Sequence, residues 1–199
     1  MSSVLELKSL DTGVDLWAGD FGNDYLRRNQ VDWQLRCDFW KMIIRITGAR
    51  SVFEMGANAG WNLSAIRREY PDVTVIGNDV NTEACQQAQQ AGIPVLNKLD
   101  FTTHVPGRYE LVFTAGVLIH IEPEHLREVM TALVAKSYRW VVAIEYDADT
   151  ETQVEYRGHK DKCWKRPYGE IYQEMGLLCR EVGNAGVGFD RCTYFLLEK

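Results

Sequence analysis

Two acidic residues and a glycine-containing turn are the clearest candidates for a binding site. Apolar, β-branched runs predict buried strands over Ser51–Met55 and Thr74–Asp79, which puts Glu54 and Asp79 near the carboxyl ends of two strands. The first strand runs into the turn Gly56-Ala57-Asn58-Ala59-Gly60, and a helix is expected to follow it. Open α/β sheets bind ligands at this edge, where glycine lets the backbone approach the ligand closely. The sequence therefore predicts a cofactor site here.

Side chains that could move a proton follow the later strands. His120 comes after the predicted fourth strand, Glu110–Thr114, and Tyr146 ends the predicted fifth strand, which starts at Arg139. His159 lies further along the chain. Histidine titrates near neutral pH, so His120 and His159 could take a proton from an acceptor, and Tyr146 could hydrogen-bond it. These three are the candidate catalytic residues. The alternative for His120 is a role in capping a helix or fixing the loop.

A basic segment between Tyr156 and Arg166 is the candidate for substrate binding. It holds five cations and one acid, a local charge of +4 in a chain with a net charge of −6. Clustered cations with interleaved aromatic rings could hold a carboxylate or a phosphate, and arginine does so best through its planar fork. The candidate substrate-binding residues are Tyr156, Arg157, Lys165 and Arg166. A solvated basic face on a surface loop is the alternative.

The elements that must position these residues alternate between strand and helix patterns, which is typical of βαβ units and a mainly parallel sheet. The tail predicts two further strands, about 177–182 and 192–198, which turn residues join into an antiparallel hairpin. We expect a doubly wound α/β fold with a seven-stranded sheet, formed by one domain over residues 1–199. Residues 1–30 form an N-terminal arm, and 147–168 an insertion on the acceptor side. The expected helices are about 31–46, 61–70, 82–91 and 123–136, and the expected third strand is 94–99.

Composition excludes several classes of protein. The overall acidity disfavours a nucleic-acid partner, because such proteins carry a basic footprint. No apolar run approaches the roughly 20 residues of a membrane span, and the pattern of the first residues leads us to expect no signal peptide. The five cysteines are scattered without a CxxC pair, so we expect no disulfide framework and no metal site, and a cytoplasmic location.

The turn after the first strand separates two classes of cofactor. A dinucleotide fingerprint would place glycine at positions 56, 58 and 61, but Asn58 and Trp61 occupy two of them. The pattern E-x-G-x-N-x-G from Glu54 to Gly60 instead resembles motif I of class I S-adenosylmethionine-dependent methyltransferases. The resemblance implies that S-adenosylmethionine is the cofactor, that Asp79 holds its ribose, and that the arm folds over it as a lid. The cofactor-binding residues are then Trp17, Tyr25, Arg28, Glu54, Gly56, Asn58, Gly60, Asn62, Leu63, Asp79, Val80, Asp100, Phe101, Thr114, Gly116 and Val117.

Several segments resemble a narrower family, the methyltransferases associated with pseudaminic acid biosynthesis. The resemblance runs through Trp17–Tyr25, the Gly116-Val117-Leu118-Ile119-His120 string, the Tyr156-Arg157-Gly158-His159 string and the last five residues. The chain departs from the pattern at Asp79, at 147–149 and at 167–169, and the last two departures fall in the acceptor region.

The function that this resemblance implies is methyl transfer to a small anionic metabolite, a nonulosonic-acid-type sugar or its precursor. A natural-product methyltransferase acting on an amino acid or peptide is the alternative. An NAD-dependent oxidoreductase and a non-catalytic cofactor-binding protein are lesser alternatives.

Overall fold

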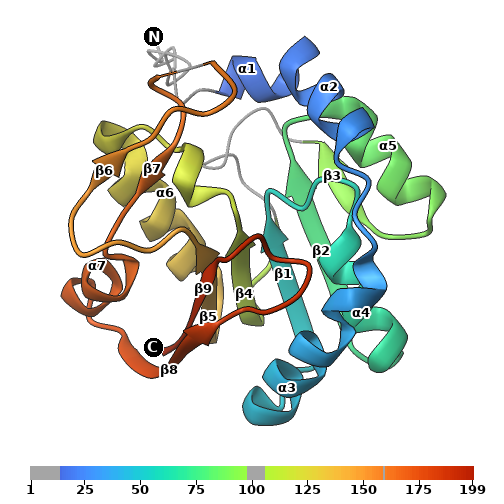
Figure 1. The fold of residues 1–199 in the computed structure, drawn as a ribbon. Helices are drawn as coiled ribbons and strands as arrows, with labels where there is room; N and C mark the ends of the chain where they lie inside the picture. Colours follow the sequence, from blue (N-terminus) through green and yellow to red (C-terminus); the bar gives the residue numbers. More distant parts are fainter. Residues whose placement is uncertain (1–13, 98–105, 159) are drawn as a thin grey trace, which may run out of the picture.

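A seven-stranded sheet forms the centre of the molecule (Figure 1). The computed structural model describes residues 14–97, 106–158 and 160–199. The strand order is β3-β2-β1-β4-β5-β9-β8, with β1 to β5 parallel and β9 antiparallel to both β5 and β8. The strands of this sheet are β1 (Ser51–Met55), β2 (Thr74–Asp79), β3 (Val95–Asn97), β4 (Tyr109–Ala115), β5 (Ser137–Glu145), β8 (Leu178–Asn184) and β9 (Thr193–Glu198).

Helices cover both faces of this sheet, because side chains of each strand alternate between two apolar clusters. On one face, Val52 and Val75 pack with α3, α4 and α5, and on the other, Phe53 and Val141 pack with α6 and α7. The helices are α1 (Val14–Ala18), α2 (Asp20–Arg28), α3 (Cys37–Thr47), α4 (Trp61–Glu69), α5 (Thr82–Gln90), α6 (Pro123–Ala135) and α7 (Tyr168–Glu174), with 3₁₀ turns η1 (Trp33–Arg36) and η2 (Leu118–His120).

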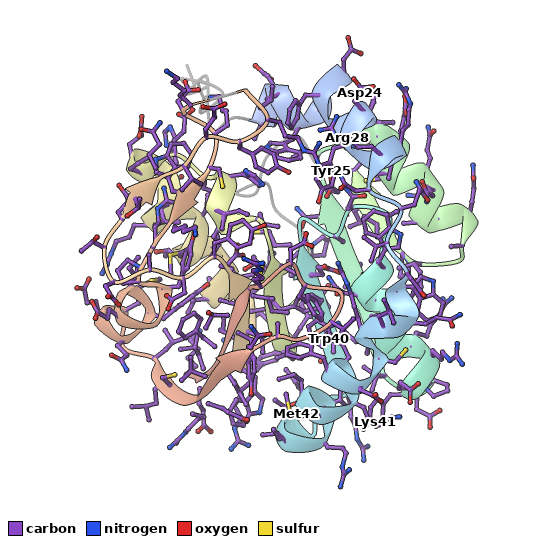
Figure 2. The ribbon with its side chains drawn as sticks, in the orientation of Figure 1. Asp24, Tyr25, Arg28, Trp40, Lys41 and Met42 are labelled. Atoms are coloured by element: carbon purple, nitrogen blue, oxygen red, sulfur yellow. The ribbon has the colours of Figure 1, made fainter. Side chains whose placement is uncertain are left out.

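Helix α3 shows how the amphipathic pattern sets the packing. Trp40 and Ile43 are fully buried against the sheet, whereas Lys41 and Met42 are only half-buried (Figure 2). The helix ends at Gly48, whose left-handed backbone (φ +63°) lets its N–H donate to the carbonyl of Ile44. Strand β1 begins three residues later.

The order in which the parallel strands are added reverses at β1. Strands β2 and β3 lie on one side of it, and β4 and β5 lie on the other. In a doubly wound sheet the connections leave this point toward opposite faces, so a crevice opens at the carboxyl ends of the strands. The predicted strands β1 and β2 have the expected bounds, and the C-terminal hairpin is confirmed.

The N-terminal arm and the 147–168 segment contain elements that the sequence pattern did not predict. Helices α1 and α2 form within the arm, and two short strands, β6 (Thr152–Gln153) and β7 (Trp164–Lys165), pair within the insertion. Helix α7 follows immediately. The described residues contain no helix with the length and apolarity that crossing a membrane requires.

Gly77 at the centre of β2 offers a test of this packing. An added Cβ would lie 2.6 Å from the Cβ of Ala57 and 3.2 Å from the carbonyl oxygen of Glu54. We therefore expect Gly77→Val to lower the free energy of unfolding by about 1–3 kcal/mol, measured by urea denaturation. Thr74→Val, on the exposed part of the same strand, is the matched control, and equal stability of the two variants would contradict this packing.

Candidate functional site

A cavity of about 400 Å³ opens at the carboxyl ends of β1, β2 and β4. Helices α1 and α2 form its roof (Figure 1), and Trp17, Tyr25 and Arg28 of these helices line it. The predicted residues that line it are Trp17, Tyr25, Arg28, Glu54, Gly56, Asn58, Asn62, Asp79, Val80, Gly116, Val117 and His120. The structure thus brings together residues from the arm, the first two strands and the loop after β4.

The turn after β1 is left-handed at three positions, with φ of +72° at Gly56, +48° at Asn58 and +75° at Gly60. At Gly56 a Cβ would lie 2.5 Å from Val117, so only glycine lets the two loops approach this closely. The N–H groups of the turn are satisfied internally. That of Asn58 donates to Asp79 (2.7 Å), that of Ala59 to the Asn58 side chain (2.8 Å), and that of Gly60 to the carbonyl of Ala57 (2.8 Å).

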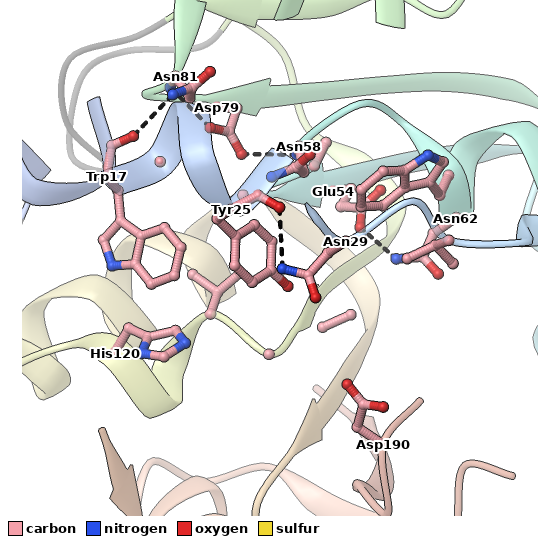
Figure 3. A pocket seen from close by; sticks show the side chains of 18 of the residues that line it. Trp17, Tyr25, Asn29, Glu54, Asn58, Asn62, Asp79, Asn81, His120 and Asp190 are labelled. Carbon is pink, nitrogen blue, oxygen red and sulfur yellow. Dashed lines mark hydrogen bonds between the residues drawn. The ribbon is translucent and has the colours of Figure 1, made fainter. Parts of the chain in front are cut away.

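Glu54 is buried at the base of the cavity and has one unsatisfied oxygen. Its Oε1 accepts a hydrogen bond from Asn62 (2.6 Å), while Oε2 has no partner among the described residues (Figure 3). The amide oxygen of Asn62 in turn accepts from Arg36 and from the ring N–H of Trp40. Burial raises the pKa of Glu54 to about 8, because removal from water disfavours the charged carboxylate. A cationic group on a ligand would complete this site.

Asp79 connects the turn to the roof of the cavity. Its carboxylate accepts hydrogen bonds from the N–H groups of Asn58 (2.7 Å) and Asn81 (2.8 Å), and burial raises its pKa. The side chain of Asn81 donates to the carbonyl of Trp17 and to Asn23, and its oxygen caps α5 (Figure 3). The arm is therefore tied to the strand end that carries the acid.

His120 lies beside the cavity in the 3₁₀ turn after β4. Its Nδ1 is 2.6 Å from the carbonyl oxygen of Lys162, an atom that can only accept, so Nδ1 carries the proton. The ring contacts Trp17 and Tyr156, with centroid distances of 4.6 and 4.8 Å. Burial lowers its pKa to about 4. His120 is therefore neutral at pH 7, with Nε2 as a hydrogen-bond acceptor.

Tyr146 does not line the cavity, and burial raises its pKa to about 12. Its phenol therefore stays protonated at pH 7.

The side chains of the basic segment were predicted to bind a substrate, but the structure gives them other positions and partners. The guanidinium of Arg166 is fully buried and donates to the carbonyls of Leu118 and Ile121 (both 2.8 Å) and to Glu151 (2.7 Å). Because these groups occupy it, Arg166 is not free to bind a substrate, which corrects its predicted role. Arg157 and Lys165 are exposed and lie outside the cavity lining.

Three predicted cofactor-binding residues lie behind the cavity. Leu63 and Thr114 are fully buried in the core, and a Cβ on Gly60 would face Ile93 at 2.9 Å. Their contribution is to shape the turn and the strand ends. The predicted adenine-side residues Asp100 and Phe101 and the candidate base His159 lie outside the described residues.

Several lining residues were missed by sequence reasoning. Asn81 precedes a predicted helix and has the residue type of an N-cap, a signal that could have identified it. Asp32 carries the same signal, because it is the N-cap of η1 and accepts a hydrogen bond from the N–H of Gln34. Arg36 and Asp190 have no such signal, because they reach the cavity from η1 and from the distant β8–β9 connection. Asp190 has a left-handed backbone (φ +47°) and faces the opening (Figure 3).

The raised pKa of Glu54 predicts a specific pH dependence of stability. Between about pH 4.5 and 8 the folded protein binds more protons at this residue than the unfolded chain does, so stability falls as pH rises. Glu54→Gln removes this titration while keeping an oxygen for Asn62. We expect the free energy of unfolding of the variant, relative to that of the wild type, to increase by on the order of 1 kcal/mol per pH unit in this window. Denaturant titrations from pH 5 to 8 measure the difference, and a constant difference would refute the assignment.

No family model and no curated protein sequence matches the chain.

Solved structures do match. Magnesium protoporphyrin IX methyltransferase from Synechocystis with bound S-adenosylmethionine has 16% identity and a TM-score of 0.68, over 94% of this chain and 95% of that one. Human N-acetylserotonin methyltransferase in complex with S-adenosylmethionine has 13% identity and a TM-score of 0.71, over 97% and 60%. Burkholderia thailandensis 1,6-didemethyltoxoflavin-N1-methyltransferase has 13% identity and a TM-score of 0.70, over 94% and 88%. The predicted fold class is confirmed, and the chain has the fold of the class I S-adenosylmethionine-dependent methyltransferases.

Proposed function

We propose that the protein is an S-adenosylmethionine-dependent methyltransferase that acts on a small molecule. The observation that carries the proposal is the pair of buried carboxylates at adjacent strand ends in one cavity. Glu54 presents an oxygen without a partner, which suits an ammonium group, and Asp79 suits vicinal hydroxyls. S-adenosylmethionine carries both groups, an α-amino group on its methionine part and a diol on its ribose.

The same geometry argues against a dinucleotide cofactor. A pyrophosphate needs free backbone N–H groups at the helix N-terminus. Those of Asn58, Ala59 and Gly60 are already donated within the turn and to Asp79. Glu54 and Asp79 line the space that the phosphates would enter, and neither acid offers the positive charge that a pyrophosphate would need there.

The residues around the cavity orient the reactants and exclude water. When bound, S-adenosylmethionine supplies an electrophilic methyl group on a cationic sulfonium. Trp17 and Tyr25 close the cavity from the arm side, and holding two reactants in line can contribute about 7–11 kcal/mol to the acceleration.

His120 is the proposed proton acceptor. Its Nε2 takes the proton of an acceptor O–H or N–H as the new bond to the methyl carbon forms. The cofactor, when bound, would supply the methyl group and keep the electron pair of the broken sulfur–methyl bond on its sulfur. The imidazolium formed in this step then releases the proton to water and returns to the neutral ring.

For the acceptor we propose a small anionic metabolite of the nonulosonic-acid type. Arg28 in the cavity lining supports an anionic group, and Arg157, outside the lining, lies beside the ring of Tyr156, which packs on His120. The second candidate is an amino acid or peptide, because Asp32 and Asp190 at the cavity opening would favour a cationic group.

Calorimetric titration tests the cofactor. We expect S-adenosylhomocysteine to bind one-to-one and NAD not to bind. Asp79→Ala should weaken the binding at least 10-fold, since it removes the ribose contact and releases the turn, whereas Asp72→Ala at an exposed site should not. Binding of NAD alone, or of neither ligand, would overturn the proposal.

Turnover tests the role of His120. We expect His120→Ala to lower kcat by about 10²–10⁴-fold, with affinity for S-adenosylhomocysteine nearly unchanged. The assay screens anionic sugars and amino acids as acceptors, with His125→Ala on α6 as control. Turnover equal to that of the wild type would remove His120 from the mechanism, and cofactor binding without turnover on any acceptor would favour the non-catalytic alternative.

A further inference from the structure

Two buried side chains, an acid and a base, hold the turn that carries His120. The carboxylate of Glu145, at the end of β5, accepts hydrogen bonds from the N–H groups of Val117 and Ile119 (3.3 Å each). The guanidinium of Arg166 donates to the carbonyls of Leu118 and Ile121 (2.8 Å each). Both side chains are 0% exposed. The acid therefore binds the donors of the turn, and the base binds its acceptors.

The two residues come from segments that are fixed to each other. The N–H of Arg166 donates to the carbonyl of Tyr146, and the N–H of Ala148 donates to the carbonyl of Arg166 (3.2 Å each). The chain after β5 thus runs beside the chain after β7. Glu151 binds the remaining guanidinium nitrogen at 2.7 Å. These contacts make the end of β5, the insertion and the turn one unit.

The same unit supplies the hydrogen-bond partner of His120. The carbonyl of Lys162, four residues before Arg166, accepts the Nδ1 proton. If the turn shifted relative to the insertion, this bond would be lost and the ring could adopt either neutral tautomer. The tautomer decides whether Nε2 accepts a hydrogen bond or donates one.

We propose that Glu145 and Arg166 are positioning residues, which together fix the turn so that His120 keeps its proton on Nδ1 and presents Nε2 as an acceptor. Their pairing with the backbone explains why two charged side chains are buried here. Removal of either one leaves backbone groups unsatisfied in the interior, which is costly. The catalytic consequence rests on the proposed methyltransferase function, but the effect on the tautomer does not.

Nitrogen NMR of the imidazole rings, recorded without ligands, tests the proposal. The signals of His120 are identified by their absence in His120→Asn. We expect the wild type to show the Nδ1–H tautomer alone. Glu145→Gln has nearly the same shape, but its amide group opposes one of the two N–H donors, so both tautomers should appear. Arg166→Met should show the same mixture, and Arg166→Lys, which can still donate to one carbonyl, should be closer to the wild type.

Controls separate positioning from general destabilisation. Lys162→Ala keeps the backbone carbonyl and should leave the tautomer unchanged. Circular dichroism establishes which variants fold, and if Arg166→Met does not, Glu145→Gln and Arg166→Lys decide. A folded Glu145→Gln with the wild-type His120 signals, or an Nε2–H tautomer in the wild type, would overturn the proposal.

In the turnover assay the same variants should lose about 10- to 100-fold in kcat at unchanged affinity for S-adenosylhomocysteine, because the base is misplaced while the cofactor site is intact. Loss of that affinity instead would contradict a role confined to the turn. Failure of the wild type to bind the ligand would refute the proposed function alone and leave the NMR result standing.

Discussion

The hydrogen bonds accepted by the Asp79 carboxylate are the interaction on which the site depends. One oxygen takes the N–H of Asn58 and the other that of Asn81, so a single side chain fixes the left-handed turn after β1 and the start of α5. Asn81 then extends the connection to the carbonyl of Trp17 in the arm. Buried charge is tolerated when hydrogen bonds satisfy it, and here those bonds also build the cavity.

The electrostatics of the cavity are arranged for a ligand with a positive end. Burial raises the pKa values of both Glu54 and Asp79, and the hydrogen bonds to their charged forms offset only part of this rise. A carboxyl with an oxygen lacking a partner is expensive in the apolar interior, and a bound cation would recover that cost. S-adenosylmethionine carries such a cation in its ammonium group, so the cost of burying Glu54 and the proposed function have one physical origin.

The basic segment on the acceptor side shows that the charge of a side chain does not by itself determine what it binds. The sequence marks 156–166 as a basic patch, yet Arg166 binds backbone carbonyls and Glu151, and Lys162 pairs with Glu122 at 2.9 Å. The same segment orients His120 through a backbone carbonyl. In the described structure, the segment therefore acts largely by holding the turn after β4.

The sequence by itself determined the elements whose signals are local. The fold class, the bounds of β1 and β2, the glycine turn and the acid at the end of β2 follow from apolar periodicity and from where glycine is needed. Only the tertiary structure decided the partners of Arg166, the tautomer of His120, and the arrival of Arg36 and Asp190 at the cavity. Those outcomes depend on contacts between residues far apart in the chain. A cation's sequence neighbours do not reveal whether water, a ligand or a distant carbonyl will surround it.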